Sequence, residues 1–120
     1  MIDTASFDRT AQAAETERLW AEISAGHDLP EEALIDLRFV AGEGADAVEF
    51  MGWLEDAGYD VEHYDAEAGD DGEGPEPETV EVQTGSLPLT LATILAEERR
   101  TTEAALRFGF VPDGWGFMTA

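Results

Sequence analysis

The chain has 120 residues, 43% of them hydrophobic, which is enough for one compact domain with its own core. The absence of cysteine excludes disulfides, thiolate nucleophiles and cysteine-held zinc or iron–sulfur centres. Acidic residues number 28 against six basic ones, for a formal net charge of −22, and so acidic a chain repels the phosphate backbone of nucleic acids. We therefore expect a single domain over residues 1–120 that does not bind nucleic acid directly.

The acidic composition has two interpretations that the sequence leaves open. It serves solubility in a crowded cytoplasm, or it attracts a basic, arginine-rich protein segment. No run approaches the roughly 18 apolar residues that a membrane helix needs, and residues 1–5 do not resemble a secretion signal. We therefore expect a cytoplasmic protein that does not enter a membrane.

The first predicted element is a helix over residues 7–25. Its apolar stripe is narrow, so the helix should lie against the domain and not inside it. A strand is predicted over residues 34–40, where Ile35, Leu37 and Phe39 alternate on the face that should meet the core.

A second helix is predicted over residues 45–58, because apolar residues recur there at helical spacing and Gly58 suits the position after a helix end. Residues 59–65 alternate like a modest strand. Residues 67–78 contain only glycine, proline, aspartate and glutamate with one alanine, so we expect a flexible acidic loop.

Alternation over residues 79–84 predicts a third strand. Residues 86–88 have the pattern of a helix start, since serine caps helices and proline suits the first turn, so a helix is expected from there to Phe108. A last strand is expected around residues 115–118. This order predicts an α+β fold of the ferredoxin-like βαββαβ type: a four-stranded antiparallel sheet with two helices on one face, plus the N-terminal helix.

Two short motifs stand out, Gly58-Tyr59 and Asp113-Gly114-Trp115-Gly116. The first ends the second helix, and the second is interpreted as a turn that leads into the last strand. In this order, they resemble motifs of a bacterial family, the regulators of ribonuclease E activity of type B (RraB). The resemblance covers roughly residues 34–117. It implies a ferredoxin-like domain and a non-enzymatic inhibitor that binds an endoribonuclease of the ribonuclease E type, chiefly its non-catalytic scaffold region, and so modulates RNA decay.

The sequence departs from the family pattern at its C-terminal end. Family members carry a long acidic tail after the last strand, whereas this sequence stops at Ala120 and concentrates acid in the predicted loop. We therefore expect the residues that bind the partner in that loop and on the last strand. They are Asp70, Asp71, Glu73, Glu76, Glu78 and Trp115. Trp115 has a second interpretation, as a core residue, because it shares a face with Phe117.

No set of side chains predicts catalysis, a cofactor or a metal site. His27 and His63 are the only histidines, and neither has a partner at metal-ligand spacing. The acidic loop does not fit the EF-hand pattern. Glu97 and Glu98 are adjacent on a helix and point about 100° apart, so we expect a solvated helix face and not an acid–base pair.

Two other functions stay open. A ferredoxin-like dimer can bind a small molecule or act as a monooxygenase, which predicts a pocket between sheet and helices lined by Trp53, Tyr59 or His63. An acidic protein can also mimic nucleic acid and block a protein that binds it. The oligomeric state is not predicted.

Overall fold

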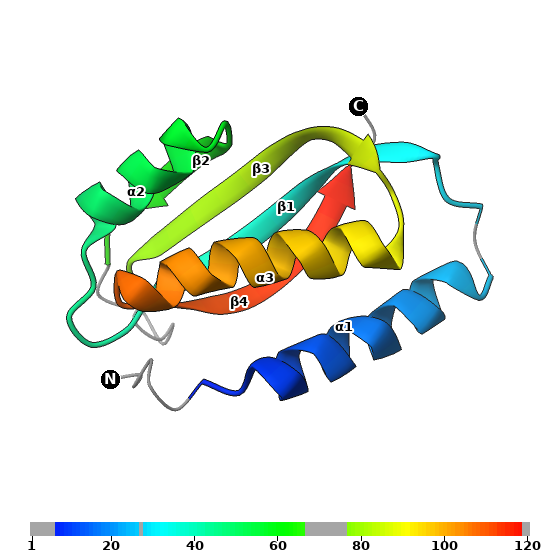
Figure 1. The fold of residues 1–120 in the computed structure, drawn as a ribbon, viewed down its shortest axis with the longest axis horizontal. Helices are drawn as coiled ribbons and strands as arrows, with labels where there is room; N and C mark the ends of the chain where they lie inside the picture. Colours follow the sequence, from blue (N-terminus) through cyan, green and yellow to red (C-terminus); the bar gives the residue numbers. More distant parts are fainter. Residues whose placement is uncertain (1–6, 27, 67–76, 119–120) are drawn as a thin grey trace, which may run out of the picture.

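The computed structural model describes residues 7–26, 28–66 and 77–118. Most of the predicted acidic loop lies outside these ranges, and so do four of the acids expected to bind the partner. They are Asp70, Asp71, Glu73 and Glu76. The helices and strands, drawn in Figure 1, are α1 (Arg9–Ser24), β1 (Glu32–Ala41), α2 (Ala47–Asp56), β2 (Asp60–Tyr64), β3 (Thr79–Pro88), α3 (Leu91–Arg107) and β4 (Phe110–Met118).

The four strands form one antiparallel sheet in the order β2-β3-β1-β4. The longest strands, β1 and β3, lie at its centre, and β2 and β4 form its edges. Both α2 and α3 cover the same face of the sheet, whereas α1 lies beside α3 at the β4 side (Figure 1). This is the ferredoxin-like arrangement with an added N-terminal helix, as the sequence predicted.

The core lies between the sheet and the two covering helices. On β1 the predicted inward-facing residues Ile35, Leu37 and Phe39 are all buried. Phe50 of α2 is fully buried at the centre, with its ring 5.3 Å from that of Phe39 and 5.1 Å from that of Phe110. The alternation on β1 and the helical spacing on α2 thus meet at one aromatic cluster.

The predicted start of the last helix at Ser86 is wrong. β3 continues through Pro88, because β1 extends far enough to pair with it, with Leu34 opposite Ser86 beyond an irregularity in the ladder. The helix cap is Thr90, whose hydroxyl accepts a hydrogen bond from the Thr93 N–H at 3.1 Å. Long-range strand pairing outweighs the local helix-start pattern here.

The last strand is also longer than predicted. β4 begins at Phe110, and the Asp113-Gly114 step lies inside it as a bulge, opposite a register shift on β1 between Leu37 and Phe39. Gly114 has a φ of +111°, which glycine adopts without strain. The motif therefore bends a continuous edge strand and does not form a turn before it.

Gly109 joins α3 to β4 at a point of close backbone approach. Its φ is +84°, and a Cβ atom placed there would lie 2.7 Å from the Cα of Ala45. Its carbonyl also accepts a hydrogen bond from the Gly42 N–H at 2.7 Å. Only glycine fits this junction. Within the described residues, no helix is long and apolar enough to span a bilayer.

Candidate functional site

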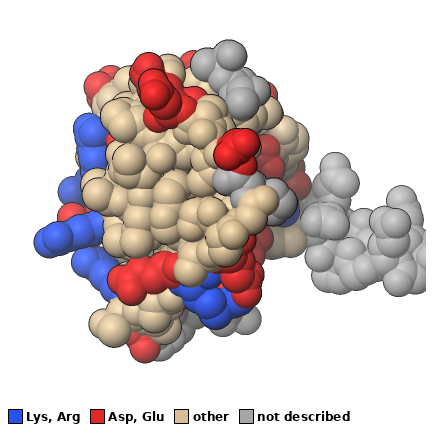
Figure 2. All heavy atoms as spheres, turned by 90° about the vertical axis from the view of Figure 1, so that its right-hand side faces the viewer, with Lys and Arg blue, Asp and Glu red and all other residues tan. Residues whose placement is uncertain are grey.

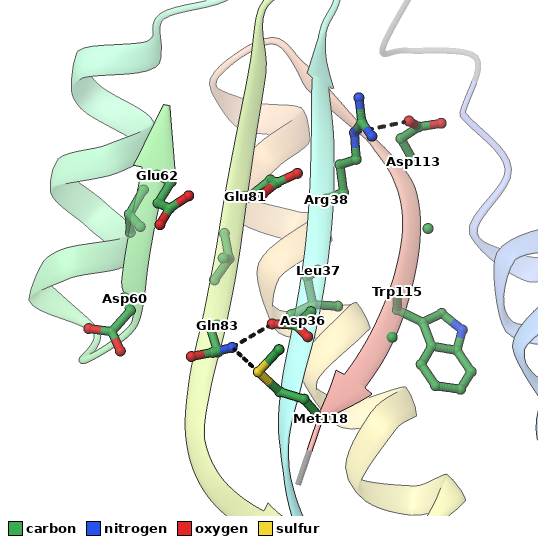
Figure 3. A pocket seen from close by; sticks show the side chains of 14 residues that line it. Asp36, Leu37, Arg38, Asp60, Glu62, Glu81, Gln83, Asp113, Trp115 and Met118 are labelled. Atoms are coloured by element: carbon green, nitrogen blue, oxygen red, sulfur yellow. Dashed lines mark hydrogen bonds and ion pairs between the residues drawn. The ribbon is translucent and has the colours of Figure 1, made fainter. Parts of the chain in front are cut away.

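The sheet face opposite α2 and α3 carries a hollow of about 840 Å³ (Figure 3). Its charged side chains come from all four strands, and we call them the acidic face. They are Asp36, Arg38, Asp60, Glu62, Glu81 and Asp113. The acidic face arises from strand alternation, since Asp36 and Arg38 stand between the buried residues of β1 and point to the opposite side.

One row of the acidic face crosses the sheet through Asp60, Gln83 and Asp36, which are register partners on β2, β3 and β1. The Gln83 side-chain amide donates to Asp36 Oδ1 at 2.8 Å and lies 3.4 Å from the Met118 sulfur (Figure 3). Gly116 stands opposite Asp36 on β4 and adds no side chain. On the β4 side, the row is therefore bordered by the Met118 side chain and not by a residue opposite Asp36.

A second row lies two residues further along each strand and runs through Glu62, Glu81 and Arg38. Glu62 and Glu81 face each other directly across β2 and β3, and like charges in that position destabilise a sheet. Arg38 Nε lies 3.5 Å from Asp113 Oδ2, in a pair that is half exposed (Figure 3). Arg38 is thus the one basic side chain among the charged residues that line the hollow.

The acidic face shares the excess of acids over bases that the whole chain has. Figure 2 views the molecule from the right-hand side of Figure 1, where acidic and basic groups both lie around a largely uncharged centre. The acidic face has five carboxylates against one guanidinium, an excess of four negative charges. Such a surface attracts cationic groups and repels phosphates.

Of the acids predicted to bind the partner, only Glu78 lies within the described residues. Its Oε2 atom is 2.8 Å from His63 Nε2, and both side chains are partly buried. Glu78 is therefore engaged within the fold. The role predicted for the other four acids stays a prediction.

Trp115 faces the covered side of the sheet. It is the register partner of Leu37 and packs, partly buried, against the core together with Phe117. Its ring points away from the acidic face (Figure 3) and lines a crevice of about 390 Å³ with residues of α1. Its buried Nε1 atom has no hydrogen-bond partner within residues 7–26, 28–66 and 77–118. Core packing therefore describes this position, and partner binding through Trp115 stays a prediction.

The Gly58-Tyr59 motif has a structural explanation. Gly58 follows α2 with a φ of +95° and donates its N–H to the Glu55 carbonyl at 3.0 Å. The buried Tyr59 hydroxyl donates to Glu97 Oε2 at 2.5 Å, so Glu97 does not simply face water as expected. Burial, reinforced by this carboxylate, strongly raises the pKa of the Tyr59 phenol.

The same region contains Trp53 and Tyr59, which were expected to line a ligand pocket between the sheet and the helices. The Arg100 guanidinium lies 5.5 Å from the ring centre of Tyr59 and 6.0 Å from that of Trp53, at cation–π distance. Tyr59 is packed in the core beneath it. Trp53 and Tyr59, two of the three side chains expected to line such a pocket, thus both contact Arg100, whereas His63 contacts Glu78.

The solvated helix face expected for Glu98 is wrong. Glu98 is only 6% exposed, because α1 packs against this side of α3. Thr16 donates its hydroxyl to Glu98 Oε1 at 2.5 Å, and the Gln12 amide lies 3.4 Å from Oε2. Burial raises the pKa of the Glu98 carboxyl, and the two hydrogen bonds oppose the rise. The sequence did contain a signal for this burial. Thr101 and Thr102 follow Glu98 by three and four residues, so they lie on the same side of the helix, and both are also buried.

Comparison with known protein families gives one match over most of the chain. The family model described as RraB, regulator of ribonuclease activity B, matches residues 12–117. The chain belongs to the RraB family. The match begins within α1 and extends into β4, so it includes the acidic face and both motifs. By this description, the family is a regulatory one that acts on ribonuclease activity. No curated protein matches the chain.

Proposed function

We propose that this RraB protein is a non-enzymatic, cytoplasmic regulator that binds and inhibits an endoribonuclease of the ribonuclease E type and so modulates RNA decay. The observation that carries the proposal is the family match over residues 12–117. The acidic face supplies one surface for the contact, and the acids predicted in the loop are a second candidate. The partner segment is an arginine-rich stretch of the nuclease's scaffold region.

The chemistry of the acidic face supports an arginine-rich partner over other cations. Guanidinium groups bind carboxylates through paired hydrogen bonds with defined geometry, whereas ammonium groups act as point charges. The Arg38–Asp113 pair is an internal example of the same contact. Asp60 and Glu62 also line the hollow and are exposed, although Glu62 accepts a hydrogen bond from the Tyr64 hydroxyl.

The spacing of the two rows also supports an extended partner. The rows are two residues apart on each strand, a separation of roughly 7 Å. Arginines at alternate positions of an extended segment have the same spacing of roughly 7 Å. A segment that lies along the strands can thus place successive arginines on successive rows.

Binding and activity measurements test this function. The triple variant D60N/E62Q/E81Q removes three charges from the acidic face, and E17Q/E43Q/E55Q removes three exposed charges elsewhere. Titration calorimetry against the arginine-rich scaffold segment should show roughly tenfold weaker binding for the first variant, from three exposed pairs. The control should lose much less, and all affinities should fall with salt.

RNA cleavage by the full-length nuclease gives the functional measurement. Wild-type protein should slow cleavage, and the acidic-face variant should slow it less at the same concentration. Binding without any change in cleavage would refute the inhibitor role. Equal binding by both triple variants and wild type would refute the acidic face as the docking surface and leave the loop acids as the remaining surface.

A further inference from the structure

A cluster of three side chains that can bind a metal lies at the β2–β3 hairpin, on the side of the hairpin that faces away from the acidic face. His63 belongs to β2, Asp65 follows its end, and Glu78 immediately precedes β3. His63 Nε2 is 2.8 Å from Glu78 Oε2, and His63 Nδ1 is 3.8 Å from Asp65 Oδ1. Fifteen residues separate His63 from Glu78, so sequence spacing gives no sign of the cluster, whereas the strand register creates it.

The backbone holds two of the three ligands in place. The Glu78 carbonyl accepts a hydrogen bond from the Ala41 N–H at 2.8 Å, and the Thr79 hydroxyl donates to the Pro77 carbonyl at 3.0 Å. His63 is fixed by its register opposite Val80. Asp65 is 91% exposed on its side chain and can turn toward the other two.

The geometry suits a small divalent ion. One ligand atom from each residue lies within 4.8 Å of the others. Ligand atoms that share a zinc ion are about 3.0–3.4 Å apart, since each lies roughly 2.0–2.1 Å from the metal. The contact between His63 Nε2 and Glu78 is close to that separation. Asp65 lies beside the other ring nitrogen, Nδ1, so its exposed side chain has to turn to the Nε2 side to complete the set.

The donor types select the metal class. One imidazole with two carboxylates suits zinc and the neighbouring transition metals, whereas calcium and magnesium prefer oxygen ligands alone. Three protein ligands leave at least one coordination position for water. The net charge of −22 concentrates divalent cations around the whole molecule and favours occupancy.

We propose that His63, Asp65 and Glu78 bind a divalent transition-metal ion of the zinc class, which ties the end of β2 to the start of β3. The bound ion clamps the two ends of the segment between these strands. The site lies apart from the rows of the acidic face and does not depend on the nuclease partner. Its simpler rival is a His–Glu hydrogen bond without any metal, together with diffuse attraction of cations to an acidic chain.

The two histidines provide a matched test. Metal-stripped full-length protein is titrated with Zn²⁺ by calorimetry in excess Mg²⁺, which occupies diffuse carboxylate sites. H63Q should bind Zn²⁺ at least tenfold more weakly than wild type. Even the loss of a residue that only hydrogen-bonds a metal ligand typically lowers metal affinity by about 10–100-fold. H27Q removes the only other imidazole and should bind like wild type. In proton NMR spectra, Ni²⁺ should broaden the His63 ring signals before those of His27.

A second pair of variants separates the site from general acidity. D65N/E78Q removes two proposed ligands, and D60N/E62Q removes two carboxylates from the same hairpin on the acidic face. Zn²⁺ affinity should fall in the first double variant and stay unchanged in the second. Equal losses in both would overturn the proposal, and so would H63Q binding Zn²⁺ as tightly as wild type. Circular dichroism of each metal-free variant confirms that it is folded.

Discussion

Along β1, the side chains of Ile35, Leu37 and Phe39 enter the core, while Asp36 and Arg38 between them face the hollow on the other side of the sheet. The covered face is apolar and closely packed around Phe50. The acidic face is polar and contains the like-charge pair of Glu62 and Glu81. Neighbouring residues of one strand therefore serve different purposes.

The comparison indicates where the stability of the domain comes from. Burial of apolar area drives folding, and nearly all of that area lies between the sheet and α2 and α3. The acidic face adds exposed charges that contribute little to stability even when paired, as Arg38 and Asp113 are. Substitutions on the two faces should thus differ in both size and sign.

The largest effect is expected at the centre of the covered face. F50A removes a fully buried ring that contacts Phe39 and Phe110, and should reduce the free energy of unfolding by about 3–5 kcal/mol. V48A, on the exposed side of the same helix with 76% of the side chain accessible, should change it by less than about 0.5 kcal/mol. Urea titrations followed by circular dichroism measure both. Similar losses in the two variants would contradict the assignment of the core.

The next effect separates two glycines that both have positive φ. In G109A, the added methyl group clashes with the backbone of Ala45, and the positive φ strains the alanine. The variant should therefore reduce the free energy of unfolding by clearly more than the roughly 1–2 kcal/mol expected from the backbone strain alone. Gly114 has open space where a Cβ would lie, so G114A should cost only about 1–2 kcal/mol. Thermal unfolding of the two variants gives the comparison. Equal costs would show that α3 and β4 do not meet the α2 start as closely as described.

A smaller, pH-dependent effect is expected where α1 meets α3. Because burial raises the pKa of Glu98, its contribution to stability is complete below the unfolded pKa and is lost as pH rises through the folded pKa. E98Q should match wild type in acid and be more stable near neutral pH, by about 1.4 kcal/mol for each unit of pKa shift.

Urea titrations across the acid-to-neutral range measure this difference. E17Q removes one exposed charge from α1 and should leave the shape of the pH profile unchanged. An E98Q variant that is less stable than wild type at neutral pH would show that the charged carboxylate is well solvated or paired, contrary to its burial.

Local pattern predicted most of the covered face, because alternation on β1 and helical spacing on α2 depend only on which side meets the core. It failed where distant segments decide the outcome. β3 continues past Ser86 because β1 pairs with it, and Glu98 is buried because α1 packs on α3. The acidic face was missed for the same reason. Its carboxylates come from four strands, and only the sheet register aligns Asp60 with Gln83 and Glu62 with Glu81.

The smallest effect is a gain in stability, and it tests the acidic face most directly. E62Q removes one member of the Glu62–Glu81 pair, so it should stabilise the protein by about 0.2–1 kcal/mol at low salt. Screening weakens exposed charges, so the gain should shrink at high salt. D60N is the control, because its register partner Gln83 is neutral and there is less repulsion to relieve. If E62Q is more stable yet binds the arginine-rich segment more weakly, this row of carboxylates favours binding over stability; a less stable E62Q would mean that the acids support the sheet itself.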